Sequence, residues 1–163
     1  MNLCRDAEAS GSLDPDFTQC VWTLETLETT QQLGQHLARH LPRGSILLLQ
    51  GELGAGKTSL VQGLAQACGI TEPITSPTFA LAQHYPDGNP PLVHLDLYRL
   101  EGPGSADELF LQEEEEARAL GALMAVEWPE RLGLQLPEAW RLELTYLQTG
   151  RRAQLTPPRN AST

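Results

Sequence analysis

The residues best suited to chemistry form a glycine-rich segment in the first half of the chain. Its sequence matches the pattern G-x-x-x-x-G-K-[ST] and reads Gly51-Glu52-Leu53-Gly54-Ala55-Gly56-Lys57-Thr58. Glycines let successive backbone N–H groups curl around an anion without obstruction from Cβ atoms. In this pattern the lysine reaches the terminal phosphates of a nucleotide and the threonine hydroxyl binds Mg²⁺. We therefore expect residues 51–58, together with Ser59, to bind a nucleotide.

Two carboxylates are candidates for binding the metal or acting on the attacking water beside this loop. Asp96 ends the apolar run 92–96, and Glu127 ends the apolar run 123–127. The carboxyl ends of strands in an open parallel sheet border the ligand crevice, so both acids could face the last phosphate of a nucleotide. Taken alone, each acid is equally compatible with a solvated loop carboxylate.

The elements around the glycine-rich segment suit its predicted role. Residues 46–49 are a continuous apolar run, which is typical of a strand buried on both faces in a parallel sheet. Apolar residues then recur at helical spacing from Leu60 to Cys68. Strand, glycine loop and helix together predict an α/β protein with the P-loop NTPase fold, in which helices flank a mostly parallel central sheet.

The remaining elements complete one domain over residues 20–148. We expect a strand over 20–24, a helix from a Thr29 cap to residue 41, a hairpin over 79–97 and a helix from 105 to about 120 capped by Ser105. A strand is expected over 122–126, and an edge strand over 141–146. Residues 1–19 are interpreted as a flexible polar arm and residues 149–163 as a frayed tail.

The charge of the chain limits what it can bind directly. The 163 residues carry a formal net charge of −10, which argues against a direct grip on nucleic-acid phosphates. Seven acids and no basic residue lie between Glu101 and Glu116. This acidic segment is either a solvated helix face or a docking surface for a basic partner. Three cysteines without C-x-x-C spacing, and no apolar run long enough for a membrane span, favour a cytoplasmic protein with no membrane contact.

The motifs together resemble those of the TsaE (YjeE) family of bacterial ATPases, which acts in the biosynthesis of threonylcarbamoyladenosine in tRNA. The resemblance covers residues 20 to about 147. Beside the phosphate loop it rests on three further segments, Thr75-Ser76-Pro77-Thr78-Phe79, His94-Leu95-Asp96-Leu97-Tyr98-Arg99 and Glu127-Trp128-Pro129-Glu130. It implies that the cofactors are ATP and Mg²⁺, and that the partners are the TsaD and TsaB proteins, through which the chain meets tRNA.

The same resemblance implies roles for individual residues. Lys57, Asp96 and Glu127 are the expected catalytic residues, and Thr58 and Glu127 are expected Mg²⁺ contacts. Asp96 would orient or deprotonate the attacking water, or hold the metal through a water molecule. Trp128 would lie beside the nucleotide, and residues 26–30, including Thr30, near the adenine. Residues 75–78 resemble a switch-like loop near the γ-phosphate.

Several alternatives stay open at this point. Arg99 could act as an arginine finger or form a structural ion pair. His94 could be a buried strand histidine or a catalytic group. The chain could also be a small-molecule kinase, although it has no arginine cluster for a lid, or a nucleotide-sensing module that does not hydrolyse its ligand.

Overall fold

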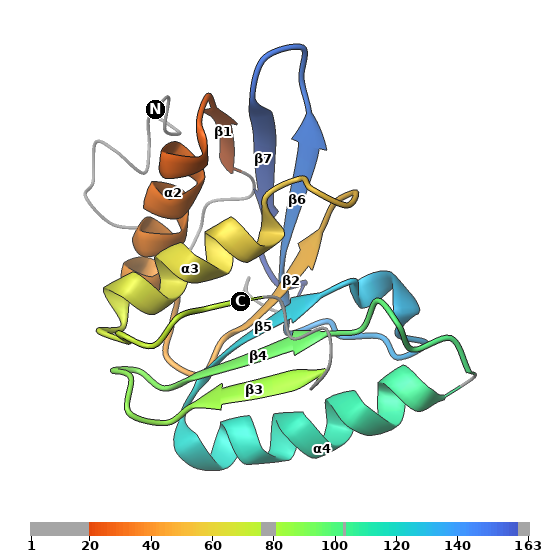
Figure 1. Ribbon diagram of the computed structural model, residues 1–163. Coiled ribbons are helices and arrows are strands. Elements are labelled where there is room, and N and C mark those ends of the chain that lie inside the picture. The colour runs from red at the N-terminus through yellow and green to blue at the C-terminus, as the bar shows by residue number, and fades with distance from the viewer. Residues whose placement is uncertain (1–19, 76–80, 103, 160–163) are drawn as a thin grey trace.

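A seven-stranded sheet organises the chain, seen in a computed structural model that describes residues 20–75, 81–102 and 104–159 (Figure 1). The strands are β1 (Cys20–Leu24), β2 (Ile46–Gln50), β3 (Ala82–Tyr85), β4 (Leu92–Asp96), β5 (Leu123–Glu127), β6 (Trp140–Tyr146) and β7 (Arg151–Thr156). Their order across the sheet is β1-β7-β6-β2-β5-β4-β3. The four central strands β6, β2, β5 and β4 run parallel, and antiparallel pairs close both sides. The predicted α/β fold with a parallel centre is confirmed.

Helices cover both faces of the sheet. Helices α2 (Leu27–His40) and α3 (Lys57–Ala67) lie on one face, and α4 (Ser105–Leu120) lies on the other, as Figure 1 shows. The short 3₁₀ helix η1 (Pro129–Arg131) follows β5. The continuous apolar run of β2 is explained by burial on both faces. Leu47 and Leu49 belong to the core on the α2–α3 side, whereas Ile46 and Leu48 belong to the core on the α4 side.

Helix α3 is held in place by an unusually close approach to α2. A Cβ atom built on Gly63 would lie 2.0 Å from the Gln31 carbonyl oxygen, and one built on Gly34 would lie 2.2 Å from the Leu60 oxygen. Any side chain at either glycine would push the helices apart. Since α3 starts at the glycine-rich loop, this contact also fixes the position of that loop.

One predicted helix start and one predicted helix cap differ from the structure. The first helix begins one turn earlier, with Thr26 as N-cap in a capping box with Thr29, because the Thr26 side chain accepts a hydrogen bond from the Thr29 N–H. Helix α4 begins at Ser105 as predicted, but Ser105 is its first helical residue and not its cap. The N-cap is Gly104, whose backbone is left-handed and which offers no side-chain hydrogen bond. In the predicted hairpin, β3 and β4 pair antiparallel as expected, while residues 79 and 80 lie outside the described part of the chain.

The interpretation of residues 149–163 as a frayed tail is wrong for residues 151–156. These residues form β7, which lies between β1 and β6. The alternation of residues 141–146 correctly predicts a strand with one exposed face. The strand, β6, is however not an edge strand, since it pairs with both β2 and β7. Strand β7 has few apolar residues because only Ala153 and Leu155 face the core.

The acidic segment is not uniformly solvated. Glu108, Glu115 and Glu116 are exposed on α4, but Glu113 is only 8% exposed and contacts His84 on β3. Helical geometry turns one residue of a four-glutamate run toward the sheet. Among the described residues, no helix is both long and apolar enough to cross a bilayer.

Replacing Leu155 by Ala tests whether the C-terminal strand belongs to the core. Leu155 is fully buried, so we expect Leu155→Ala to lower the free energy of unfolding by about 2–5 kcal/mol, measured by urea denaturation. The matched control is Arg152→Ala on the exposed side of β7, with an expected change within about 0.5 kcal/mol. Equal, small effects of both substitutions would contradict the observed packing.

Candidate functional site

The glycine-rich segment forms the turn from β2 into α3. Gly54 (φ +78°) and Gly56 (φ +109°) adopt left-handed backbone conformations that favour glycine. Gly56 is the N-cap of α3, and among the described residues no side chain caps the first N–H groups of this helix. The first turn also lacks acidic residues, so the positive end of the helix dipole is available to an anion.

Lys57 is folded back over this loop. Its ammonium group donates hydrogen bonds to the carbonyl oxygens of Gly51 and of Glu52, the latter at 3.3 Å. It also lies 4.1 Å from the centre of the Trp128 ring. Burial lowers the pKa of Lys57, while the negative charges of Glu127, Glu130 and Asp96 act in the opposite direction. A phosphate group would therefore meet a buried lysine whose ammonium is already held by two loop carbonyls beside the Trp128 ring.

Asp96 and Glu127 lie side by side at the carboxyl ends of their strands. They are direct register partners in the β4–β5 pair, and only 6% and 3% of their surfaces are exposed. Asp96 accepts a hydrogen bond from the Tyr98 N–H at 3.0 Å. The alternative of solvated loop carboxylates is therefore wrong for both residues, since both are buried beside the phosphate loop.

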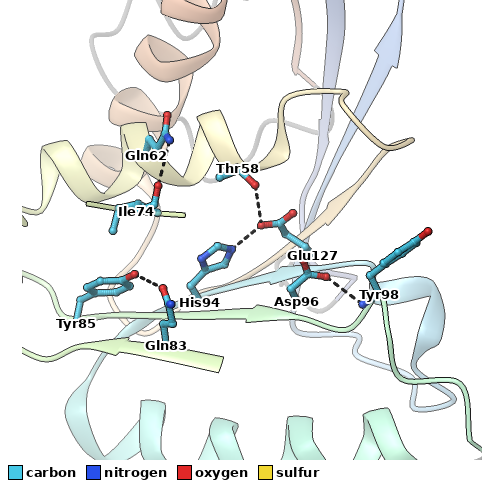
Figure 2. A network of polar contacts seen from close by, with 9 residues as sticks. All are labelled: Thr58, Gln62, Ile74, Gln83, Tyr85, His94, Asp96, Tyr98 and Glu127. Carbon is cyan, nitrogen blue, oxygen red and sulfur yellow. Dashed lines mark hydrogen bonds and ion pairs between the residues drawn. The ribbon is translucent and has the colours of Figure 1, made fainter. Parts of the chain in front are cut away.

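Glu127 connects the loop to the middle of the sheet (Figure 2). Its Oε2 atom lies 3.5 Å from the Thr58 hydroxyl oxygen and 2.6 Å from Nε2 of His94. His94 is fully buried on β4, and its Nδ1 atom has no hydrogen-bond partner among the described residues. His94 is thus a buried strand histidine that contacts a site residue.

An open cavity of about 370 Å³ joins these side chains. The predicted site residues that line it are Leu53, Gly54, Gly56, Lys57, Thr58, Ser59, Asp96, Glu127 and Trp128. Leu27, Tyr98 and Arg99 complete the lining. The strand order thus brings together residues from three separate motifs of the sequence.

The other predicted binding residues are not among those that line the cavity. Gly51 packs against the Leu144 carbonyl on β6, Glu52 accepts the Lys57 bond, and Ala55 is buried. Thr30 is also buried. A Cβ atom on Gly56 would lie 3.5 Å from its methyl group, so Thr30 supports the loop and Leu27 lines the cavity from the same helix.

The predicted switch-like loop falls largely outside the described residues. Thr75 is exposed, and residues 76–78 are not part of the described structure. The segment just before it is tied to α3, because the Gln62 side chain donates a hydrogen bond to the Ile74 carbonyl at 3.1 Å (Figure 2).

The oxygen atoms of side chains that line the cavity suit the coordination of a hard cation. A hydroxyl from Thr58 and carboxylates from Glu127 and Asp96 offer oxygen ligands only, which Mg²⁺ prefers. The 3.5 Å between the Thr58 and Glu127 oxygens is compatible with two ligands of one ion. The residues present therefore fit a magnesium ion that accompanies a nucleotide.

Comparison with known proteins supplies the family. The family model described as "Threonylcarbamoyl adenosine biosynthesis protein TsaE" matches residues 24–154. The chain belongs to the TsaE family. Its place is therefore in the biosynthesis of threonylcarbamoyladenosine in tRNA.

Individual TsaE proteins agree with this assignment. The "tRNA threonylcarbamoyladenosine biosynthesis protein TsaE" of Synechocystis is 53% identical over 118 residues, covering 70% of this chain and 72% of the relative. The protein of the same name from Bacillus subtilis is 35% identical over 132 residues, covering 81% and 80%. The crystal structure of Bacillus subtilis YdiB superposes with a TM-score of 0.69 at 28% identity, covering 86% of each chain.

The TsaE match also includes residues that sequence reasoning missed. Tyr146 and Arg151, on the β6–β7 hairpin, both contact the phosphate loop. They follow the loop by more than 90 positions and belong to no local motif. The available signal that Arg151 belongs to the domain was the family match, which reaches residue 154 and so extends beyond the predicted domain end at residue 148.

Proposed function

We propose that this TsaE-family chain binds ATP with Mg²⁺ and hydrolyses it slowly. In this proposal it acts with TsaD and TsaB in the cytoplasm, while TsaD transfers the threonylcarbamoyl group to the adenosine next to the anticodon of tRNA. The observation that carries the proposal is the single cavity in which Lys57, Thr58, Asp96 and Glu127 meet above the phosphate loop.

Each group in the cavity has a distinct task in this proposal. Loop N–H groups and Lys57 bind the β- and γ-phosphates, and Thr58 and Glu127 hold Mg²⁺. When bound, Mg²⁺ neutralises negative charge on the phosphates. Asp96 orients the attacking water or accepts its proton, which its place at the end of β4 beside Glu127 allows. His94 fixes the carboxylate of Glu127 through the contact at its Oε2 atom.

The charge of the chain is consistent with this division of labour. Phosphates held by N–H groups, a lysine and a metal ion need no basic surface. A chain with a net charge of −10 leaves tRNA to its partners. The exposed acids of α4 are our candidate docking surface for those partners, without the buried Glu113.

Substitution of the two carboxylates separates binding from hydrolysis. We expect Asp96→Asn and Glu127→Gln to lower ATP turnover about a hundredfold, because each removes a group that acts on the water or the metal. ATP affinity should change only about threefold, whereas Lys57→Ala should weaken it about tenfold or more. The measurements are release of labelled γ-phosphate and equilibrium titration. Wild-type turnover in both acid variants would contradict these roles, and label found on a metabolite would indicate a kinase.

A reconstituted modification reaction tests the cellular role. We expect the yield of threonylcarbamoyladenosine over several turnovers by TsaD, TsaB, tRNA and the threonylcarbamoyl donor to depend on this chain. Lys57→Ala should fail to restore the yield, and Asp96→Asn should restore it only in part. An undiminished yield without the chain would refute the proposal. Full restoration by a hydrolysis-deficient Asp96→Asn would indicate a nucleotide-sensing module.

Charge reversal on α4 tests the docking surface. Glu108 and Glu115 are both exposed and lie two helical turns apart. The double variant Glu108→Lys/Glu115→Lys should weaken TsaD–TsaB binding about tenfold and flatten its dependence on salt. The control, Glu72→Lys/Glu143→Lys, makes the same change in net charge at exposed positions outside α4. Equal effects of the two double variants would exclude a specific surface on α4.

A further inference from the structure

Two side chains of the β6–β7 hairpin hold the phosphate loop from outside. The Tyr146 hydroxyl donates a hydrogen bond to the Leu53 carbonyl at 2.7 Å, and Nη2 of Arg151 donates one to the Gly54 carbonyl at 3.3 Å. The Arg151 guanidinium also lies 4.2 Å from the centre of the Tyr146 ring and donates to the Gly150 carbonyl. The Arg151 guanidinium is therefore stacked on the Tyr146 ring, and the two side chains together bind the carbonyls of two consecutive peptide groups.

The Tyr146 contact helps to determine where one N–H group of the loop points. In a planar trans peptide the carbonyl and the following N–H point in opposite directions. A Leu53 carbonyl turned toward Tyr146 consequently turns the Gly54 N–H away from the hairpin. Leu53 and Gly54 line the cavity, whereas Tyr146 and Arg151 are not among its lining residues, so these two side chains contact the loop outside the cavity.

Within the loop, the Ala55 N–H donates a hydrogen bond to the Glu52 carbonyl at 3.1 Å and so sets the Gly54–Ala55 peptide. For the Leu53–Gly54 peptide, the contact found among the described residues is the one from Tyr146. Leu53 and Gly54 are exposed, and Gly54 is in a left-handed conformation from which glycine readily departs. A Cβ atom on Gly54 would lie 2.9 Å from the Tyr146 hydroxyl oxygen, so the loop passes directly over this side chain. A loop whose peptide groups are already held in one orientation loses less conformational entropy when it binds phosphate.

We propose that Tyr146 and Arg151 are positioning residues that preorganise the phosphate loop for its ligand. The inference rests on the proposed nucleotide binding and adds a second, C-terminal part to that site. Both residues act through the carbonyls of the loop, so they control affinity for the phosphate groups rather than the rate of hydrolysis. The hairpin is thus a functional part of the site as well as two strands of the sheet.

The test measures ATP and pyrophosphate dissociation constants for the folded variants. Tyr146→Phe removes one hydroxyl and keeps the ring, and we expect about threefold weaker binding of both ligands. Arg151→Gln should weaken both about tenfold, and Arg151→Lys should recover part of the loss, since lysine keeps the charge but loses the fork-shaped donor set. The rate of hydrolysis at saturating ATP should stay within about twofold of wild type in all three.

Arg152→Gln is the matched control. It removes the same charge from the neighbouring, exposed residue of β7, and it should leave both dissociation constants unchanged. Wild-type affinity in Tyr146→Phe and Arg151→Gln would overturn the inference while leaving nucleotide binding intact. A uniform loss of turnover at unchanged affinity would overturn it as well. A wild-type chain that binds neither ligand would refute the proposed function together with it.

Discussion

The parallel pairing of β2, β5 and β4 is the constraint on which the site depends. In this arrangement the phosphate loop, Glu127 and Asp96 all lie at the carboxyl ends of neighbouring strands, with Leu49 opposite Glu127 and Glu127 opposite Asp96. Three segments, each about 30 to 45 positions from the next in the sequence, thereby converge on one cavity. A slip of one residue in either pairing would turn a carboxylate to the other face of the sheet.

This convergence places charge where little water reaches it. Lys57, Asp96, Glu127 and His94 are all buried, and such groups are stable only when they compensate one another. Lys57 is compensated by loop carbonyls and nearby carboxylates, and Glu127 by His94 and Thr58. The same low hydration strengthens the electrostatic attraction that these groups exert on a bound phosphate.

The antiparallel strands added beyond β6 extend this arrangement. Strand β7 covers what would otherwise be an open sheet edge, and its first residue, Arg151, reaches the loop together with Tyr146 of β6. The close approach of α2 to α3 at Gly34 and Gly63 holds the other side of the loop. The phosphate loop is thus supported by elements from both ends of the described chain.

The sequence by itself determined the phosphate loop, the doubly buried strand before it, the amphipathic helix after it and the family. The first three features are local, because glycine spacing, apolar runs and helical periodicity act over fewer than about 20 residues. The family follows from four short motifs, each of which is local in the same way. Tertiary structure alone decided that Asp96 and Glu127 are adjacent and that His94 contacts Glu127. It also decided that Glu113 is buried and that residues 151–156 form a strand instead of a frayed tail. Strand order and register join residues that are distant in the sequence, and no local pattern encodes which strands become neighbours.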